Sequence, residues 1–192
     1  MANIDGIIKH IIRWEAGVTA TANESMESLF EKARKKGFSD NPLDRGGATM
    51  VGITLNTYKQ YCKEYHISEP TVSNLKEIPY ATWKNVLKVY YWDRYKADEI
   101  NSQSVANICV DYVWGSGKYG ITKVQKALGL TADGIVGPKT IGAINSREPR
   151  RLFELIKNVR ISHYQAIVAA NPSQKIFLKG WVNRVNNISY VG

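Results

Sequence analysis

The chain has 192 residues, enough for one compact domain or two small ones. Its content of 44% hydrophobic and 22% charged residues is ordinary for a globular protein and excludes a wholly disordered chain. The net charge of +9 favours an anionic partner, such as nucleic acid, a membrane surface or an acidic cell-wall polymer.

The first forty residues predict two amphipathic helices. Isoleucines at helical spacing form the stripe of the first, which ends at Trp14: Ile4, Ile7, Ile8, Ile11 and Ile12. Asn23 is expected to cap the second helix, and Gly37 is expected to stop it. Residues 39–54, rich in glycine, asparagine, aspartate and proline, then predict a structured loop or a small β-hairpin.

The rest of the chain is also predicted to be helical. Thr54 is expected to cap one helix, and Pro79 to lie in the first turn of another. A new helix opens at Gly137-Pro138, and the longest runs from Arg150 to Ala170. With little room left for strands, the sequence predicts a mainly α fold.

Neither the cysteines nor the histidines predict a cofactor. Cys62 and Cys109 lie in apolar helical patterns, which favours two buried free thiols over a disulfide. The three histidines are scattered, and none lies at metal-ligand spacing from Cys, Asp or Glu. We therefore expect neither a metal nor another cofactor.

Glu15 follows Trp14 at the end of the first predicted helix. A carboxylate at that position meets the negative end of the helix dipole, and the apolar helix behind it disfavours ionisation further. Both effects suit a general acid, because the group must hold its proton near neutral pH. An exposed glutamate at a frayed helix end would have the same sequence, so this residue alone does not decide between a general acid and a surface residue.

The most unusual segment is Asn41-Pro-Leu-Asp-Arg-Gly-Gly-Ala-Thr-Met-Val-Gly-Ile-Thr54. Its glycines and proline restrict the backbone, and Asp44, Arg45 and Thr49 supply polar groups. A rigid loop with an acid and a hydroxyl can position water or a sugar near a helix end. A simple connecting turn, with Asp44 capping the local backbone, is the alternative.

Together these segments resemble glycoside hydrolase family 108, a family of lysozyme-like N-acetylmuramidases found among phage endolysins and secretion-associated proteins. The resemblance rests on Trp14-Glu15-Ala16-Gly17 and on the loop just described, above all its Gly-Gly-Ala-Thr stretch. In the second half, Asp111 before Gly115-Ser-Gly, Asp133-Gly-Ile-Val-Gly-Pro-Lys-Thr140 and Phe177–Arg184 resemble the predicted peptidoglycan-binding region of such proteins. The resemblance implies a lysozyme-like helical fold with a catalytic region at 1–97 and a peptidoglycan-binding region at 98–192.

The resemblance also implies roles for particular residues. It makes Glu15 the catalytic glutamate, and it places Asp44 and Thr49 where they would orient water or steady the charged sugar. Arg45, Tyr58 and Trp114 are the residues we expect to bind substrate.

Two departures from the family pattern matter. Residues 18–37 form an insertion that contains a whole amphipathic helix and three glutamates that compete for the catalytic role: Glu24, Glu27 and Glu31. Ala16 stands where the family has a glycine, and Gly115 stands where the family often has asparagine.

Two further patterns have simpler interpretations. Gly115-Ser-Gly-Lys-Tyr-Gly120 matches the dinucleotide-binding pattern GxGxxG, but it follows a helix and lies outside any βαβ unit, so we expect no nucleotide site. Basic residues in the longest helix predict either a solvated face or a surface that attracts the anionic wall. These are Arg150, Arg151, Lys157 and Arg160.

The sequence therefore predicts a monomeric muramidase whose partner is peptidoglycan. We expect neither nucleic-acid binding nor stable insertion into a membrane. A non-enzymatic wall-binding or secretion-associated protein, and a chitosanase or chitinase on the same scaffold, are the alternatives. The residues from Met1 to Trp14 do not resemble a secretory signal, because Asp5, His10 and Arg13 interrupt the apolar run. We thus expect synthesis in the cytoplasm and release to the wall through a holin or an export system.

Overall fold

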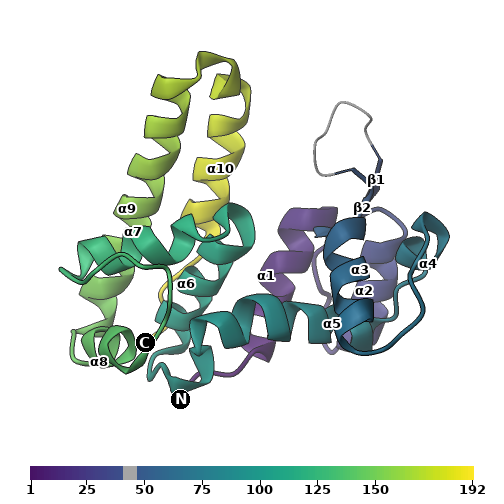
Figure 1. The fold of residues 1–192 in the computed structure, drawn as a ribbon, viewed down its shortest axis with the longest axis horizontal. Coiled ribbons are helices and arrows are strands. Elements are labelled where there is room, and N and C mark those ends of the chain that lie inside the picture. Colours follow the sequence, from purple (N-terminus) through teal and green to yellow (C-terminus); the bar gives the residue numbers. More distant parts are fainter. Residues whose placement is uncertain (41–46) are drawn as a thin grey trace. The chain divides into compact units, whose positions relative to one another are not determined.

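The computed structural model describes residues 1–40 and 47–192, and it confirms the mainly α fold (Figure 1). The chain divides into two compact units. One, here the first unit, comprises Ile8–Val89, and the second comprises Met1–Ile7 with Tyr90–Gly192. Among the described residues, no helix combines the length and the apolar character that crossing a lipid bilayer requires.

The first unit holds five helices and a small sheet among its described residues. The helices are α1 (Asp5–Ala16, which begins in the second unit), α2 (Met26–Arg34), α3 (Leu55–Glu64), α4 (Val72–Lys76) and α5 (Tyr80–Leu87). The strands are β1 (Phe38–Ser39), β2 (Thr49–Met50) and β3 (Ile53–Thr54). The stripe of isoleucines is confirmed for Ile7, Ile8, Ile11 and Ile12, which are fully buried, whereas Ile4 precedes α1 and is only partly buried.

The caps of two helices show where local sequence rules hold. Thr54 caps α3 as predicted, since its hydroxyl accepts a hydrogen bond from the backbone N–H of Thr57 at 3.1 Å. The predicted Asn23 cap is wrong. Asn23 has a φ of 60°, a left-handed conformation that an N-cap does not adopt, and Ser25 caps α2 by accepting from the N–H of Ser28 instead.

The three strands form an antiparallel sheet in the order β1-β2-β3. Opposite residues share a face of the sheet, so the register places Phe38, Met50 and Ile53 in one row. Met50 and Ile53 are buried, which makes this the core face. Strands β2 and β3 form the short hairpin that the glycine-rich sequence indicated.

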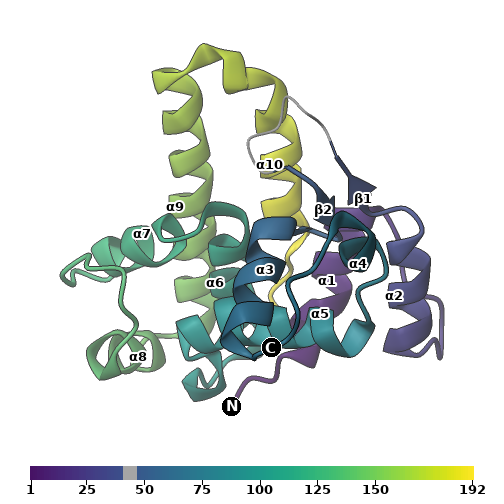
Figure 2. The same cartoon turned by 45° about the vertical axis from the view of Figure 1, so that its right-hand side comes forward.

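The second unit is built from helices in the part of the chain that the structure describes. A π-helix (Lys88–Trp92), which begins at the end of the first unit, and two 3-10 turns (Asp93–Tyr95 and Ala97–Glu99) lead into α6 (Gln103–Ser116). Helices α7 (Tyr119–Ala127), α8 (Pro138–Asn145), α9 (Pro149–Ala170) and α10 (Lys175–Asn187) follow, with a 3-10 turn at Pro172–Gln174. Helices α9 and α10 lie side by side in both views (Figures 1 and 2).

The GxGxxG segment forms the corner between α6 and α7. Gly117 turns the chain with a φ of 54°. At Gly120 a Cβ would come within 2.6 Å of the backbone nitrogen of Val113 and 2.7 Å of the carbonyl carbon of Tyr112, so only glycine allows α7 to approach α6 this closely. Gly117 therefore serves the turn, and Gly120 serves the packing of the two helices.

A buried ionic cluster joins α6, α9 and α10. Arg160 donates to Asp111 at 2.6 Å, and both side chains are completely buried. Arg184 donates to the same carboxylate at 2.7 Å. The prediction that Arg160 lies on a solvated basic face is therefore wrong, because its charge pairs with an aspartate 49 residues away in the sequence.

Candidate active site

Glu15 lies in the last turn of α1, with its side chain partly buried. The preceding turn is anchored in the core by Ile11 and Ile12, which are fully buried. Figures 1 and 2 both show the C-terminal end of α1 beside the base of the small sheet. The carboxyl group is thus carried on a rigid helix at the end where the dipole is negative.

Gly37 fixes how closely the helix end and the sheet approach each other. A Cβ on Gly37 would lie 3.1 Å from the Cβ of Ala16 and 2.9 Å from the Cγ2 of Val51. The carbonyl of Gly37 also accepts a hydrogen bond of 2.9 Å from the backbone N–H of Val51. Glycine at this position therefore brings the residue after Glu15 against the β2–β3 turn.

The β2–β3 turn itself has a strained residue. Val51 adopts a φ of 45°, which a β-branched residue rarely does, and Gly52 follows with 77°. The side chain of Val51 is fully buried, and its carbonyl accepts a hydrogen bond of 3.0 Å from the indole N–H of Trp83. Packing on both sides holds this conformation, as is common near functional sites.

The face of the sheet opposite the core carries a row of hydroxyl groups. Ser39, Thr49 and Thr54 are direct partners in the register, so their side chains share this face. Thr54 is occupied by its capping role, with its hydroxyl 2.9 Å from that of Thr57. For Thr49, no side-chain hydrogen bond forms within residues 1–40 and 47–192. Within that part of the chain, its hydroxyl can therefore turn to water or a sugar.

The other predicted site residues are placed differently. Asp44 and Arg45 lie outside the described residues. Tyr58 is only 9% exposed on α3, and burial together with the neighbouring Cys62 raises the pKa of its hydroxyl. Trp114 belongs to the second unit, where its ring packs 4.5 Å from that of Tyr91. Of the predicted residues, the structure thus places Glu15, Thr49 and Tyr58 in one unit.

The insertion at 18–37 contains α2 and its three glutamates. Glu24 is held by hydrogen bonds from Lys32, from the Thr21 backbone and from Ser28, which lower its pKa to about 2. Such a carboxylate is ionised at neutral pH and cannot serve as a general acid. Glu31 forms an exposed ion pair of 2.6 Å with Arg34.

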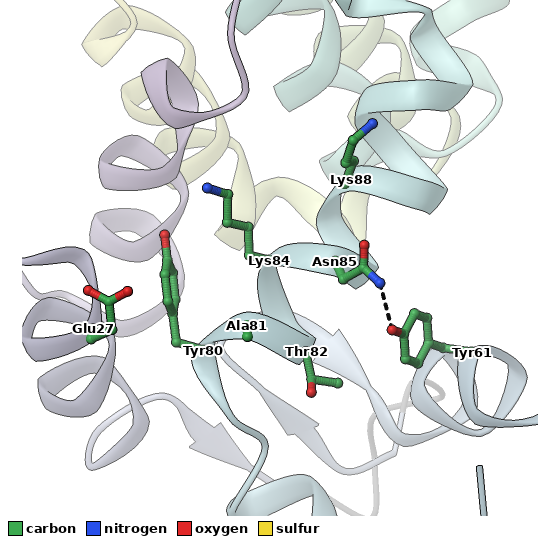
Figure 3. A pocket seen from close by; sticks show the side chains of 8 residues that line it. All are labelled: Glu27, Tyr61, Tyr80, Ala81, Thr82, Lys84, Asn85 and Lys88. Carbon is green, nitrogen blue, oxygen red and sulfur yellow. Dashed lines mark hydrogen bonds between the residues drawn. The ribbon is translucent and has the colours of Figure 1, made fainter. Parts of the chain in front are cut away.

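Glu27, the third glutamate, lines a cavity of about 540 Å³ on the first unit (Figure 3). Tyr80 and Lys84 of α5 also line it, and Asn85 donates a hydrogen bond of 2.7 Å to the hydroxyl of Tyr61 at its edge. Neither Glu15 nor Thr49 is among its lining residues. The cavity is therefore a different feature from the helix end that carries Glu15.

Sequence reasoning missed the hydroxyl row and the buried ionic cluster. The row depends on the register of three two-residue strands, and only its Thr49 was singled out from the sequence. Asp111 and Arg184 did stand within segments that resemble the peptidoglycan-binding region, but nothing in their local pattern indicated that they pair with each other and with Arg160.

Comparison with known proteins identifies the family of the chain. The sequence model of the family described as Glycosyl hydrolase 108 matches residues 8–117, more than half of the chain, and that of the Predicted Peptidoglycan domain matches residues 119–186. The solved structure of SagA from Brucella abortus is similar, with a TM-score of 0.66 and 25% sequence identity over 83% of this chain and 90% of that chain. No curated protein matches the chain. The chain belongs to glycosyl hydrolase family 108 and carries a peptidoglycan domain in its C-terminal half.

Proposed function

We propose that this glycoside hydrolase is an N-acetylmuramidase that cleaves the β-1,4 bond between N-acetylmuramic acid and N-acetylglucosamine, with Glu15 as the general acid. Membership of the family and the peptidoglycan domain make the chain a glycosidase that acts on peptidoglycan. The observation that carries the finer proposal is the position of Glu15, at the end of a helix that Gly37 brings against the β2–β3 turn.

The reaction needs one group that gives a proton and one that handles water. As the bond between C1 and the glycosidic oxygen breaks, Glu15 donates its proton to that oxygen, which leaves as an alcohol. Water adds its oxygen to C1 and loses a proton to a base. Thr49 is proposed to orient this water, because its hydroxyl stands on the outer face of the sheet.

Asp44 is proposed to orient the attacking water or to steady the charged sugar, on the family resemblance alone, since it lies outside the described residues. Arg45, Tyr58 and Trp114 remain the proposed substrate-binding residues. The small exposed fraction of Tyr58 favours a contact through the edge of its ring or its hydroxyl rather than through a ring face.

Two of the three glutamates in the insertion are held in other interactions, which supports Glu15 as the general acid. Glu24 is committed to a network of hydrogen bonds that keeps it ionised, and Glu31 is paired with Arg34. The excess of basic residues, with 26 Lys and Arg against 17 Asp and Glu, favours binding to the anionic cell wall.

Product analysis tests the proposed bond. Purified peptidoglycan is digested with the wild-type protein, the products are reduced with borohydride, and mass spectrometry identifies the reduced sugar. A muramidase leaves N-acetylmuramic acid at the new reducing end, whereas reduced N-acetylglucosamine would contradict the assignment. Digestion of chitosan or chitin but not of peptidoglycan would favour the alternative of a chitosanase or chitinase.

We also propose that the enzyme acts at the cell wall or in the periplasm, after passage through a membrane-pore partner or an export system. Fractionation of producing cells with and without such a partner tests this. Wall lysis only when the partner is present supports the proposal, and equal lysis without it contradicts the need for a partner.

A further inference from the structure

The second unit has a pocket of about 380 Å³ between the α6–α7 corner and the sides of α9 and α10. Gly115 and Ser116 line it at the end of α6, and Tyr119 lines it at the start of α7. Tyr164 and Trp181 contribute from the two long helices, together with small and aliphatic residues of α9. All of these residues lie within the part matched by the two family models, and none belongs to the first unit.

Aromatic rings line this pocket, and that of Tyr119 is well exposed. Tyr119 is 61% exposed, although its ring lies 5.3 Å from that of His163. Trp181 stacks against Phe177 at 5.9 Å and tilts against Tyr164 at 5.2 Å. Exposed amphipathic rings at a pocket suit a ligand that has both apolar faces and polar edges, as a sugar ring does.

A positive charge lies beneath the pocket. Among the described residues, Nη2 of Arg160 has no hydrogen-bond partner, and it lies 3.5 Å from the position of a Cβ on Gly115. Arg160, Arg184 and Asp111 together have two guanidinium groups and one carboxylate, so these three side chains carry one net positive charge. A carbonyl or carboxylate oxygen of a ligand above Gly115 would be attracted by this charge.

His163 adds a second polar group to the lining of the pocket. The Nδ1 of His163 is 2.9 Å from the hydroxyl of Tyr112, and burial, with Lys123 and Arg160, lowers the pKa of His163. A neutral ring that accepts from Tyr112 through Nδ1 has its proton on Nε2. Because His163 lines the pocket, this N–H can donate to a ligand oxygen.

We propose that this pocket binds one N-acetylated amino sugar of a glycan strand. The sugar ring stacks on Tyr119 or Trp181, and the acetamido carbonyl lies above Gly115, near the excess positive charge. The inference deepens the proposed function, because it rests on peptidoglycan as the substrate and assigns a place on the second unit that holds the strand. The same sugar occurs in chitin, so the test must separate the two polymers.

Titration of the full-length, ¹⁵N-labelled protein with triacetylchitotriose, followed by NMR, locates the site. We expect shifts at the amides of residues 115–119 and at the indole N–H of Trp181, and much smaller shifts with the deacetylated trimer. Shifts confined to other residues, or equal shifts with both trimers, would overturn the proposal.

Variants sharpen the test. Tyr119→Ala removes an exposed ring and is expected to weaken binding of the trimer about tenfold, a typical loss for one aromatic contact. Ile176→Ala is the matched control, since Ile176 is 78% exposed on α10 and does not line the pocket. Gly115→Leu is expected to obstruct the pocket, whereas at Gly115→Ala the added Cβ makes only ordinary contacts. Unchanged binding in both Tyr119→Ala and Gly115→Leu would overturn the proposal.

Sedimentation with purified sacculi and with chitin distinguishes the two polymers and the two proposals. If Tyr119→Ala sediments with sacculi more weakly than Ile176→Ala does, the pocket is supported as a peptidoglycan site. If Tyr119→Ala loses sedimentation only with chitin, peptidoglycan is not the source of the bound sugar. If the wild type cleaves sacculi but Tyr119→Ala sediments with them as the wild type does, the proposal of a sugar-binding pocket is wrong and the proposal of a muramidase is kept. If the wild type cleaves nothing but the trimer shifts appear, the muramidase proposal fails and the pocket stands.

Discussion

The indole nitrogen of Trp83 donates a hydrogen bond of 3.0 Å to the carbonyl oxygen of Val51, and both side chains are fully buried. Val51 is the residue of the β2–β3 turn with the strained backbone, and it follows Thr49 by two positions. The bond therefore fastens the sheet that carries Thr49 to α5. It links the stability of the first unit to the geometry of the candidate site.

Trp83→Phe tests this link. The substitution keeps most of the buried ring but leaves the Val51 carbonyl without its donor, which is expected to cost about 1–3 kcal/mol of unfolding free energy. Urea denaturation measures the loss, and the amide shifts of Thr49 and Gly52 should change with it. Wild-type stability and unchanged shifts would contradict the role given to this hydrogen bond.

Gly37→Ala tests the close approach of the helix end and the sheet. The new methyl group would meet Val51 at 2.9 Å and Ala16 at 3.1 Å, so the packing must shift. We expect a loss of about 1–3 kcal/mol, typical of overpacking, with reduced hydrolysis because the end of α1 moves. Gly180→Ala is the control, since an added Cβ on α10 meets nothing within 4 Å there. Equal stability and activity of both variants would refute the account of Gly37.

Glu24→Gln tests the pH dependence of the insertion. Hydrogen bonds from Lys32 and Thr21 lower the pKa of Glu24 from 4.5 to about 2, so the ionised side chain stabilises the fold above pH 4.5. This contribution is lost as the pH falls towards 2. The difference in melting temperature between wild type and Glu24→Gln should therefore be largest near neutral pH and shrink from pH 4.5 to 2. A difference that grows on acidification would have the wrong sign for this account.

Asp111→Asn tests the buried ionic cluster of the second unit. Removing the charge leaves two guanidinium groups without their common partner, and we expect a loss of about 3–5 kcal/mol. Arg184→Met should cost less, because the side chain is 14% exposed and Asp111 keeps its bond to Arg160. Calorimetry ranks the two variants, and a more severe loss in Arg184→Met would show that the carboxylate is not the centre of the cluster.

Local signals in the sequence predicted much of the fold. The cap at Thr54 and the helix start at Gly137-Pro138 are confirmed, because each depends on residues within one turn of the chain. The prediction of an Asn23 cap is wrong because Ser25, two residues further on, has the extended backbone that a cap requires. The π-helix at Lys88–Trp92 had no signal in the periodicity.

The candidate site was predictable only in part. The position of Glu15 at a helix end follows from the isoleucine stripe, which stops at Trp14. The hydroxyl row could not be foreseen, because it depends on which residues of the strands stand opposite one another. Arg160 was placed on a surface because a charged residue within a basic helix face is usually solvated, and its partner Asp111 is distant in the sequence.

The most direct test of the central claim is digestion of purified peptidoglycan by the wild type and by Glu15→Gln, with release of reducing ends as the readout. Glu27→Gln, on the exposed face of α2, serves as the matched control. We expect Glu15→Gln to keep the wild-type melting temperature and to lose about 10²–10⁴-fold in rate, the usual contribution of a general acid, while Glu27→Gln retains activity. Cleavage by Glu15→Gln at the wild-type rate, or a comparable loss in Glu27→Gln, would contradict the assignment of Glu15.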